Sequence, residues 1–254
     1  MLLAIDIGNS DITIGYSAGN AWEPVWRIPT AADLPQMYYS MQLVNVFLES
    51  GLKHEDVTRV VISSVVPEMT SKIVDTCVGL FQTDPVVLGP DVYKTLPLIL
   101  RNPYEIGADL VANALAALTR YKSNCVVVDF GTALTFTTVS GQGEVVGVSI
   151  APGLKTAIRS LSQNTARLFD VPLEMPASVL GKDTTHAIQA GVLIGYEGMV
   201  MHMLQRIRDE LGDAHLKSIA TGGLCNSIPS LKTVFTDIEP NLTLEGLKIV
   251  AEMQ

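Results

Sequence analysis

Cysteine and histidine are both scarce in this chain, which has three cysteines and four histidines in 254 residues. Cys77, Cys125 and Cys225 lie far apart and form no C-x-x-C pair, so the sequence indicates neither a zinc site nor a disulfide framework. We expect ordinary buried or half-buried thiols. A G-x-S-x-G motif is also missing, and the histidines form no recognisable nucleophile arrangement, which disfavours a Ser-His-Asp hydrolase.

Positive charge is in short supply as well. Seventeen Lys and Arg residues stand against 26 Asp and Glu residues, which gives a net charge of −9 and a pI near 4.9. Because proteins bind nucleic acids mainly through Lys and Arg, we expect no nucleic-acid partner. The apolar run from Leu2 to Ile5 is too short for a membrane span or a signal peptide, is interrupted by Asp6, and has no basic segment before it. We therefore expect a cytoplasmic protein without a membrane partner.

Apolar residues, by contrast, are abundant, at 48% of the chain. A chain of this length and composition can bury a large core and form two compact domains. Strand-like runs alternate with helix-like periodic segments, and this pattern predicts an α/β fold with mixed sheets. We place the domains at residues 1–120 and 121–254, and we expect the terminal helix, 242–253, to pack back against the first domain.

A strand from Glu23 to Pro29 and a helix from about Gln36 to Ser50 follow the first predicted hairpin. The helix carries apolar residues at helical spacing, which predicts that they pack into the core. These residues are Met37, Met41, Val44, Phe47 and Leu48.

The first 17 residues predict a β-hairpin with a phosphate-binding turn. The apolar run ends at Asp6, the turn Gly8 to Ser10 follows, and alternation resumes through Ile12 and Ile14. Glycine allows the backbone to approach a bulky ligand, while Asn9 and Ser10 add short donors. A carboxylate binds a metal ion but repels a bare phosphate, so this turn suits a phosphate that carries a divalent cation.

The same pattern returns in residues 124–140. Asp6 corresponds to Asp129, Gly8 to Gly131 and Ser17 to Ser140, always at an offset of 123 residues. A repeat close to half the chain length indicates a duplicated domain, in which two phosphate hairpins can face each other across a cleft. The alternative is coincidence, because D-x-G is a common way to end a strand.

Five motifs in order along the chain carry a family resemblance. Residues Asp6 to Ser10 and Asp129 to Ala133 resemble the first and second phosphate motifs of the acetate and sugar kinase, Hsp70 and actin superfamily. The stretches Asn102 to Asp109, Ile150 to Leu154 and Leu242 to Leu247 make the chain most similar to the type III pantothenate kinases. The resemblance implies duplicated actin-like, ribonuclease H-like domains with mixed sheets and an interdomain cleft.

The resemblance also implies an ATP-dependent kinase that converts pantothenate to 4′-phosphopantothenate, the first step of coenzyme A biosynthesis. It implies that Asp6 holds Mg²⁺ and that Asp129 lies near a monovalent cation, potassium or ammonium. The implied ATP-binding residues are Asp6, Gly8, Asn9, Ser10, Thr13, Gly131, Thr132, Gly222 and Gly223. On the sequence alone, the Gly222-Gly223 pair after a strand is equally well explained as a plain turn.

Asp109 has two possible roles. It lies at or just before the first turn of a predicted helix, Leu110 to Tyr121, where Asp is favoured as an N-cap. In the kinases that the chain resembles, the Asp of this G-x-D motif is the general base for the substrate hydroxyl, and Gly107-Ala108-Asp109 matches it. The resemblance favours the base.

Thr184 similarly has two interpretations. Gly181-Lys182-Asp183-Thr184 is not a Walker motif, because position 176 is Pro and Asp follows the Lys. Thr184 and Thr185 can cap the helix that runs to about Leu211. The resemblance instead implies that Thr184 reaches the substrate across the interface of a homodimer with a shared active site.

The implied substrate-binding residues are Leu100, Gly107, Ala108, Asp109, Leu110 and Thr184. Two of them depart from the family pattern, because Leu110 stands where Arg is common and Leu100 where Tyr is common, with Arg101 following where Asp is usual. The ATP motifs are unaffected. Three hypotheses therefore remain: a pantothenate kinase, a kinase of the same fold for another hydroxylated acid or amide, and a weakly active nucleotide-binding regulator.

Overall fold

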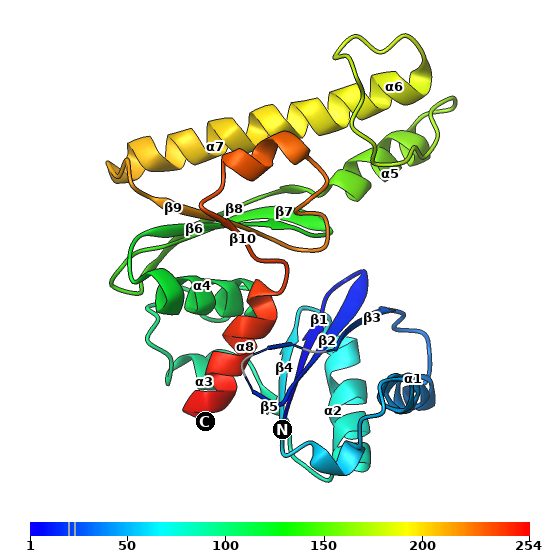
Figure 1. Cartoon of the computed structure of the whole chain (residues 1–254), viewed down its shortest axis with the longest axis vertical. Coiled ribbons are helices and arrows are strands. Elements are labelled where there is room, and N and C mark those ends of the chain that lie inside the picture. Colours follow the sequence, from blue (N-terminus) through cyan, green and yellow to red (C-terminus); the bar gives the residue numbers. More distant parts are fainter. Residues whose placement is uncertain (20, 23) are drawn as a thin grey trace. The chain divides into compact units, whose positions relative to one another are not determined.

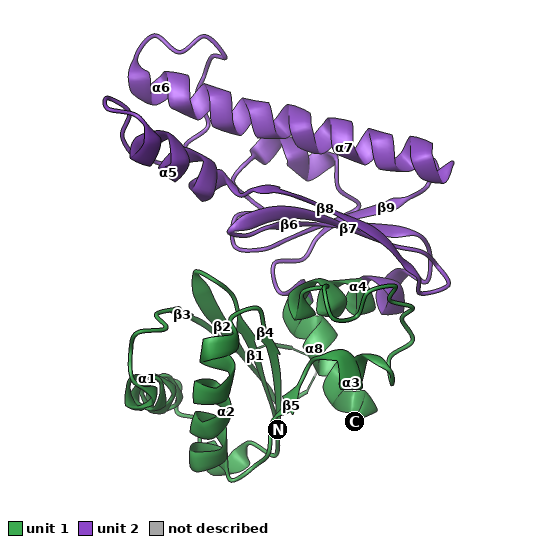
Figure 2. Cartoon of the chain, turned by 180° about the vertical axis from the view of Figure 1, so that it is seen from behind, with its two compact units in different colours: residues 1–116, 243–254 green, residues 117–242 purple. Residues whose placement is uncertain are grey.

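The structure, a computed structural model, describes residues 1–19, 21–22 and 24–254, and it divides into two compact units (Figure 2). Unit 1 comprises residues 1–116 and 243–254, and unit 2 comprises residues 117–242. Each unit contains a five-stranded sheet with both parallel and antiparallel strand pairs. The predicted α/β class with duplicated mixed sheets is confirmed.

The sheet of unit 1 has the strand order β3-β2-β1-β4-β5 (Figure 1). The pairs β1–β2 and β2–β3 are antiparallel, whereas β1–β4 and β4–β5 are parallel. In chain order the elements are β1 (Leu2–Ile7), β2 (Asp11–Ser17), β3 (Val25–Pro29), α1 (Gln36–Glu49), the 3₁₀ turn η1 (His54–Asp56), β4 (Arg59–Ser64), α2 (Pro67–Phe81), β5 (Val86–Val87), α3 (Pro90–Tyr93), α4 (Ala108–Tyr121) and, from the chain end, α8 (Leu242–Met253).

The sheet of unit 2 has the strand order β10-β9-β6-β7-β8. Its elements are β6 (Cys125–Phe130), β7 (Ala133–Val139), β8 (Val145–Pro152), α5 (Leu154–Asn164), α6 (Thr184–Gln189), the π-helical turn η2 (Ala190–Ile194), α7 (Gly195–Leu211), β9 (Lys217–Thr221), the 3₁₀ turn η3 (Pro229–Thr233) and β10 (Asp237–Ile238). The unit boundaries fall inside α4 and at the start of α8.

The two sheets repeat the same topology, since β6 to β10 take the places of β1 to β5. The central strands keep the predicted offset of 123 residues. The strands that follow them, β2 and β7, do not keep this offset. Leu2 pairs with Ser17, whereas the equivalent Cys125 pairs with Val139. The predicted equivalence of Ser17 and Ser140 is therefore wrong by one residue. The second hairpin has the shorter turn, two residues (131–132) against three (8–10).

Strand alternation separates the two faces of each sheet. In unit 1, Ile5 and Ile7 belong to a core cluster that includes residues of α1 and α2, so Asp6 faces the opposite side of β1. In unit 2, Val128 and Phe130 belong to a cluster that includes residues of α5 and α7, so Asp129 faces away from it. Both carboxylates therefore lie on the sheet face opposite the helices of that cluster.

The packing of α1 corrects one expectation. Its buried residues are Tyr39, Leu43, Val46 and Phe47. Of the five residues predicted to be core, only Phe47 is buried, while Met37, Met41, Val44 and Leu48 are exposed. The prediction was wrong because α1 is apolar along two sides at helical spacing, and periodicity alone does not tell which side meets the sheet.

The remaining expectations concern single segments. The predicted strand start, Glu23, lies outside the described residues. All three cysteine side chains are buried. In the described part of the chain, one helix, Thr184–Leu211, is long and apolar enough to match a membrane span by length and composition alone. It contributes Val192, Val200 and Leu204 to the core of unit 2, as a core helix does.

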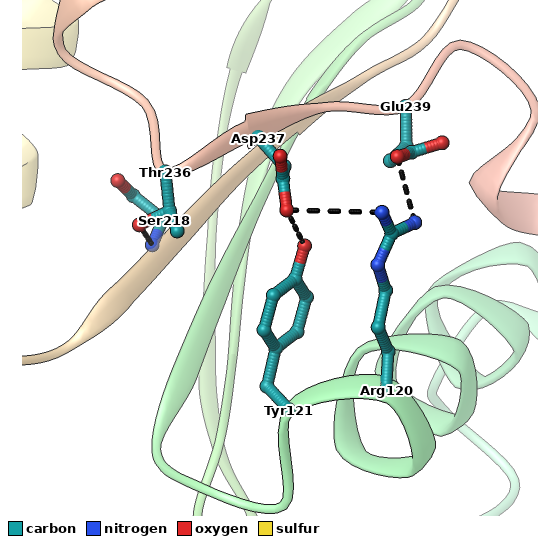
Figure 3. Close-up of polar contacts among 6 residues, drawn as sticks. All are labelled: Arg120, Tyr121, Ser218, Thr236, Asp237 and Glu239. Carbon is teal, nitrogen blue, oxygen red and sulfur yellow. Dashed lines mark hydrogen bonds and ion pairs between the residues drawn. The ribbon is translucent and has the colours of Figure 1, made fainter.

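Side chains from the last turn of α4 hold the short edge strand β10 in unit 2 (Figure 3). The Tyr121 hydroxyl donates to the Asp237 carboxylate, and the Arg120 guanidinium pairs with Glu239 at 2.6 Å. Burial, followed by the bond to Asp237, raises the pKa of Tyr121. These contacts fix a strand of only two residues at the sheet edge.

The helix α8 packs tightly within unit 1. A Cβ on Gly246 would lie 2.0 Å from the Ala112 carbonyl oxygen of α4, and the Thr243 hydroxyl donates to Asn113 Oδ1 at 2.9 Å. Trp22 donates to Glu245 at 2.7 Å. This approach is possible only because residue 246 has no side chain.

We predict that Gly246→Ala lowers the free energy of unfolding by about 1–3 kcal/mol, because a methyl group there must displace backbone. Gly198→Ala is the matched control, since Gly198 is also helical but has nothing within 4 Å of its Cβ position. The control should be neutral or stabilise by up to about 1 kcal/mol. Urea unfolding followed by circular dichroism measures both. Equal midpoints for the two variants would contradict the close packing of α8 on α4.

Candidate active site

The first predicted phosphate turn joins β1 to β2 in unit 1. The Gly8 amide donates to the Asp11 carbonyl at 3.0 Å, and the Thr30 hydroxyl donates to the Gly8 carbonyl at 2.7 Å. Asn9 and Ser10 are exposed at the tip. The turn is thus anchored at its base while its tip residues face solvent.

The second predicted phosphate turn joins β6 to β7 in unit 2 in the same way. The Gly131 amide donates to the Ala133 carbonyl at 3.1 Å, and Thr132 is exposed. A Cβ on Gly153, the N-cap of α5, would lie 2.2 Å from the Gly131 carbonyl oxygen. The N-terminus of α5 therefore lies directly against this turn.

Two donors from the start of α5 hold the Thr132 carbonyl. The Gly153 amide donates to it at 2.9 Å and the Thr156 hydroxyl at 2.6 Å. The Tyr196 hydroxyl of α7 in turn donates to the Pro152 carbonyl at 2.7 Å. The orientation of the turn is therefore fixed by α5, and sequence reasoning did not identify Thr156 or Tyr196.

The backbone of Gly222 lies directly against the Asp129 carboxylate. Its φ of +90° is in the left-handed region that favours glycine, and a Cβ would lie 2.3 Å from Asp129 Oδ1 and 2.8 Å from Phe130 backbone atoms. The strand β9 ends at Thr221, so the turn that follows it passes directly over the end of β6. The structure thus brings Gly222 together with Asp129, as one local group.

A row of oxygen-bearing side chains crosses each sheet at the carboxylate. In unit 2, Asp129 pairs in register with Thr135 of β7 and Thr221 of β9. Residues directly opposite each other on neighbouring strands point to the same face. The hydroxyls of Thr135 and Thr221 are buried and, within the described chain, have no hydrogen-bond partner.

The row in unit 1 consists of Thr13, Asp6 and Ser63, which pair in register across β2, β1 and β4. Thr13 is buried, and the Ser63 hydroxyl is buried without a hydrogen-bond partner among the described residues. Sequence reasoning found Thr13 but missed Ser63, Thr135 and Thr221. Asp6 and Asp129 are the signal that could have led to them, once the neighbouring strands are known.

Asp109 is the second residue of α4 and not its N-cap, because the helix begins at Ala108. Its Oδ1 accepts from the Leu110 amide at 2.8 Å. Burial raises the pKa of the Asp109 carboxyl, while bonds from the Leu110 amide and its own amide oppose the rise. Asp109 is thus one residue inside the helix and not at the N-cap position, although its carboxylate accepts from first-turn amides as a capping side chain does. The carboxyl holds a proton more readily than a solvated Asp does.

Neighbouring residues leave little space around the Asp109 carboxylate. A Cβ on Gly107 would lie 2.4 Å from Asp109 Oδ1, so position 107 accepts no side chain while the carboxylate keeps this position. Ala108 and Leu110 are buried, whereas Leu100 is half-buried and Arg101 is exposed. Burial, and then the charge of Asp109, raises the pKa of Tyr93 to about 12. Tyr93 therefore stays protonated at neutral pH beside the carboxyl.

Thr184 is the exposed first residue of α6 in unit 2. The N-cap is Asp183, whose Oδ1 accepts from the His186 amide at 2.9 Å and whose Oδ2 lies 2.6 Å from His186 Nδ1. The bond from the His186 amide, followed by the His186 ring, lowers the pKa of Asp183. The prediction that Thr184 and Thr185 cap this helix is wrong, which leaves the Thr184 hydroxyl exposed at the helix start.

Comparison with known proteins gives one consistent result. A family profile described as type III pantothenate kinase matches residues 2–206. The chain is 40% identical over 252 residues to the type III pantothenate kinase of Anaeromyxobacter dehalogenans (strain 2CP-C), covering 99% of each. It is 42% identical over 258 residues to that of Treponema pallidum (strain Nichols), covering 99% of this chain and 94% of the relative. Among solved structures, MreB 5 of Spiroplasma citri bound to AMPPNP has a TM-score of 0.56 at 10% identity. The match covers 99% of this chain and 96% of the MreB 5 chain. That last likeness shows an actin-like fold.

We predict that Thr156→Val weakens ATP binding by up to about tenfold, because it removes one hydrogen bond that orients the second phosphate turn while keeping the side-chain shape. Thr156→Ser keeps the hydroxyl and should bind ATP as the wild type does. The measurement is the rise in melting temperature with ATP and Mg²⁺. If all three proteins show the same rise, Thr156 does not orient this turn for nucleotide binding.

Proposed function

The chain belongs to the type III pantothenate kinases, and we propose that it transfers the γ-phosphoryl group of ATP to the hydroxyl group of pantothenate. The product is 4′-phosphopantothenate, and the reaction is the first step of coenzyme A biosynthesis. The observation that carries the proposal is similarity over 99% of the chain to kinases of this type.

The two phosphate turns are the proposed ATP-binding elements. In the first, the backbone around Gly8 with Asn9 and Ser10 would donate to phosphate oxygens, as the exposed tip of the turn allows. In the second, Gly131 and Thr132 would do the same. The buried Thr13 would add its hydroxyl beside Asp6. Gly222 and Gly223 would lie against the adenosine, because a backbone without side chains admits a flat ring.

Asp6 is the proposed ligand of Mg²⁺. Among the described residues no group of three or more His, Cys, Asp or Glu side chains could hold a metal. This fits Mg²⁺ in a kinase, which is usually bound by one or two carboxylates together with substrate phosphates. Bound Mg²⁺ would neutralise charge on the β- and γ-phosphates. Asp6 would orient it, flanked by the hydroxyls of Thr13 and Ser63.

Asp129 is the proposed site of the monovalent cation, potassium or ammonium. Its neighbours Thr135 and Thr221 carry buried hydroxyls for which the described residues supply no partner, and such oxygens suit a hard cation. The residues present therefore fit a cation beside Asp129. A bound cation would supply positive charge close to the second phosphate turn, which follows Asp129 by two residues.

Asp109 is the proposed general base, which takes the proton of the pantothenate hydroxyl as the phosphoryl group is transferred. Its raised pKa supports this role, because a base is most effective when its pKa approaches the working pH. The two amides that its carboxylate meets are those of Asp109 and Leu110, and they oppose the rise in pKa. Because a general base must be deprotonated to accept a proton, activity should fall as the pH is lowered through the raised pKa of Asp109.

The proposed pantothenate pocket comprises Leu100, Gly107, Ala108, Leu110 and Thr184. Leu110 leaves it without the cation that the family commonly supplies there, and a charge-assisted bond to the substrate carboxylate is worth about 1.5–3 kcal/mol. Arg101, which is exposed, is the first candidate to replace it.

Thr184 would enter the pocket of a second copy, so we propose a homodimer with a shared active site. Its exposure at the start of α6 is compatible with this role. We also propose a cytoplasmic location, where ATP and pantothenate are available.

A kinase for another hydroxylated acid or amide is the second candidate, and Leu110 is the feature that favours it. A weakly active nucleotide-binding regulator is the third. An assay of ADP release separates them. Turnover only with pantothenate supports the first, turnover with a different acceptor supports the second, and nucleotide binding without turnover supports the third.

We predict that Asp109→Asn lowers the turnover number by about 10²–10⁴-fold, the usual contribution of a general base. The variant should be as stable as the wild type or more stable at neutral pH. Because the folded pKa is raised, the stability contribution of this carboxyl is present at low pH and lost as the pH rises, so removing its charge has no cost at pH 7. Single-turnover kinetics and thermal melts test the two parts. An active variant would rule out the base.

We predict that Leu110→Arg lowers the KM for pantothenate, with a smaller change in the turnover number, because the substrate carboxylate is remote from the reacting hydroxyl. Leu110→Met is the control, since it keeps the apolar volume and adds no cation. It should leave the KM unchanged. An unchanged or higher KM in the Arg variant would mean that another cation, with Arg101 tested next, already binds the carboxylate.

A further inference from the structure

The exposed side of α1 carries a continuous apolar stripe. Met37 is 67% exposed, Met41 58%, Val44 40% and Leu48 71%. At 3.6 residues per turn these four positions lie within an arc of about 60°. The buried residues of the helix, Tyr39 among them, lie on its other side, where α1 packs beside α2 in unit 1 (Figure 1). The stripe is therefore not required by the core of its own unit.

The stripe has the spacing of a helix-pairing seam. Its residues are separated by four, three and four positions, which is the alternation of the two apolar positions in a heptad. The outer side of a surface helix normally carries charged residues, yet Glu49 is the only charged residue in α1. Contact surfaces between proteins are likewise poor in charge and rich in Met. The composition of this side matches a surface that is covered by another helix.

The stripe is also symmetric along the helix. Met37 and Leu48 are equidistant from the helix midpoint, between Gln42 and Leu43, as are Met41 and Val44. A two-fold axis at this midpoint would place Met37 against the partner's Leu48 and Met41 against the partner's Val44. A two-fold contact requires this self-complementarity, in which each residue of a pair meets its counterpart on the other copy.

The charges at the ends of α1 favour the antiparallel arrangement. The helix has no acidic residue in its first turn, and Glu49 is in its last turn, where the helix dipole disfavours a carboxylate. In an antiparallel pair, Glu49 would lie near the partner's Gln36, at the positive end of the partner helix. Each carboxylate would then meet a favourable dipole.

We propose that α1 is a self-association surface that pairs with α1 of a second copy of this chain, antiparallel about a two-fold axis. Four side chains form a patch on the order of a few hundred Å². The contact would bury less than the roughly 1,200–2,000 Å² of a standard interface, so the association is weak and depends on protein concentration. The stripe shares no residue with the proposed acceptor pocket or with Thr184, so we propose this pairing separately from the kinase dimer.

Sedimentation velocity over a range of concentrations tests the pairing. The wild type should gain mass as the concentration rises, and Val44→Lys should raise the dissociation constant of that step at least about tenfold, because a charge in the apolar seam is costly to bury. Asn45→Lys is the matched control, since Asn45 is exposed on the same helix but outside the stripe. It should associate as the wild type does, and thermal melts check that both variants fold.

Cross-linking tests the orientation. The three native cysteines are buried, so an introduced surface thiol reacts selectively with a short bismaleimide. The double variant Met37→Cys, Leu48→Cys should cross-link into dimers, whereas Met37→Cys alone should not, because the two Met37 positions would be about 16 Å apart along an antiparallel pair.

Three results would each overturn the proposal. They are a wild-type mass that does not rise with concentration, equal association of Val44→Lys and the wild type, and efficient cross-linking of Met37→Cys alone. The last result would indicate a parallel pair. A stripe that only another protein covers would give the second result, because the proposed kinase dimer would still raise the mass of both proteins.

Discussion

The antiparallel and parallel pairing of one central strand in each sheet is the constraint on which the proposed site depends. β1 and β6 each end beside a carboxylate, and hydrogen bonding to both neighbours fixes which side chains flank it. A shift of one residue on either side would turn Ser63 or Thr221 to the opposite face. Strand register thus determines which oxygen-bearing side chains surround Asp6 and Asp129. It also fixes the positions of the turns that follow β1 and β6.

The parts of this arrangement that are local in sequence could be predicted, and the parts that depend on distant pairing could not. The turns at Gly8 and Gly131 follow from apolar runs that stop at Asp, and the helix after Gly107 follows from its periodicity. Ser63 and Thr221 could not be assigned, because a parallel partner lies far along the chain. The buried side of α1 could not be chosen either, since both sides are apolar and only the tertiary fold distinguishes them.

Leu110 adjoins the Asp109 carboxyl through its backbone amide and contributes its side chain to the proposed acceptor pocket. The buried Leu110 side chain adds no compensating charge next to a carboxyl whose pKa burial already raises. The same residue leaves the proposed acceptor pocket without a cation, while its backbone amide donates to the Asp109 carboxylate and opposes the rise in its pKa. Position 110 therefore bears on both proposed roles, through its side chain in the proposed pocket and its amide at the carboxyl.

The π-helical turn Ala190–Ile194 has a consequence for the proposed substrate-binding residue at the start of the same helix. A π turn contains one residue more than the surrounding α-helical ladder, which rotates everything before it by about 100° relative to everything after it. The residues of α7 that pack into the core therefore do not determine the direction in which Thr184 points. That direction depends instead on α6 itself, which packs Ile188 into the core of unit 2 and is capped by Asp183. The π turn thus lets α6 and α7 each pack into the core in its own phase.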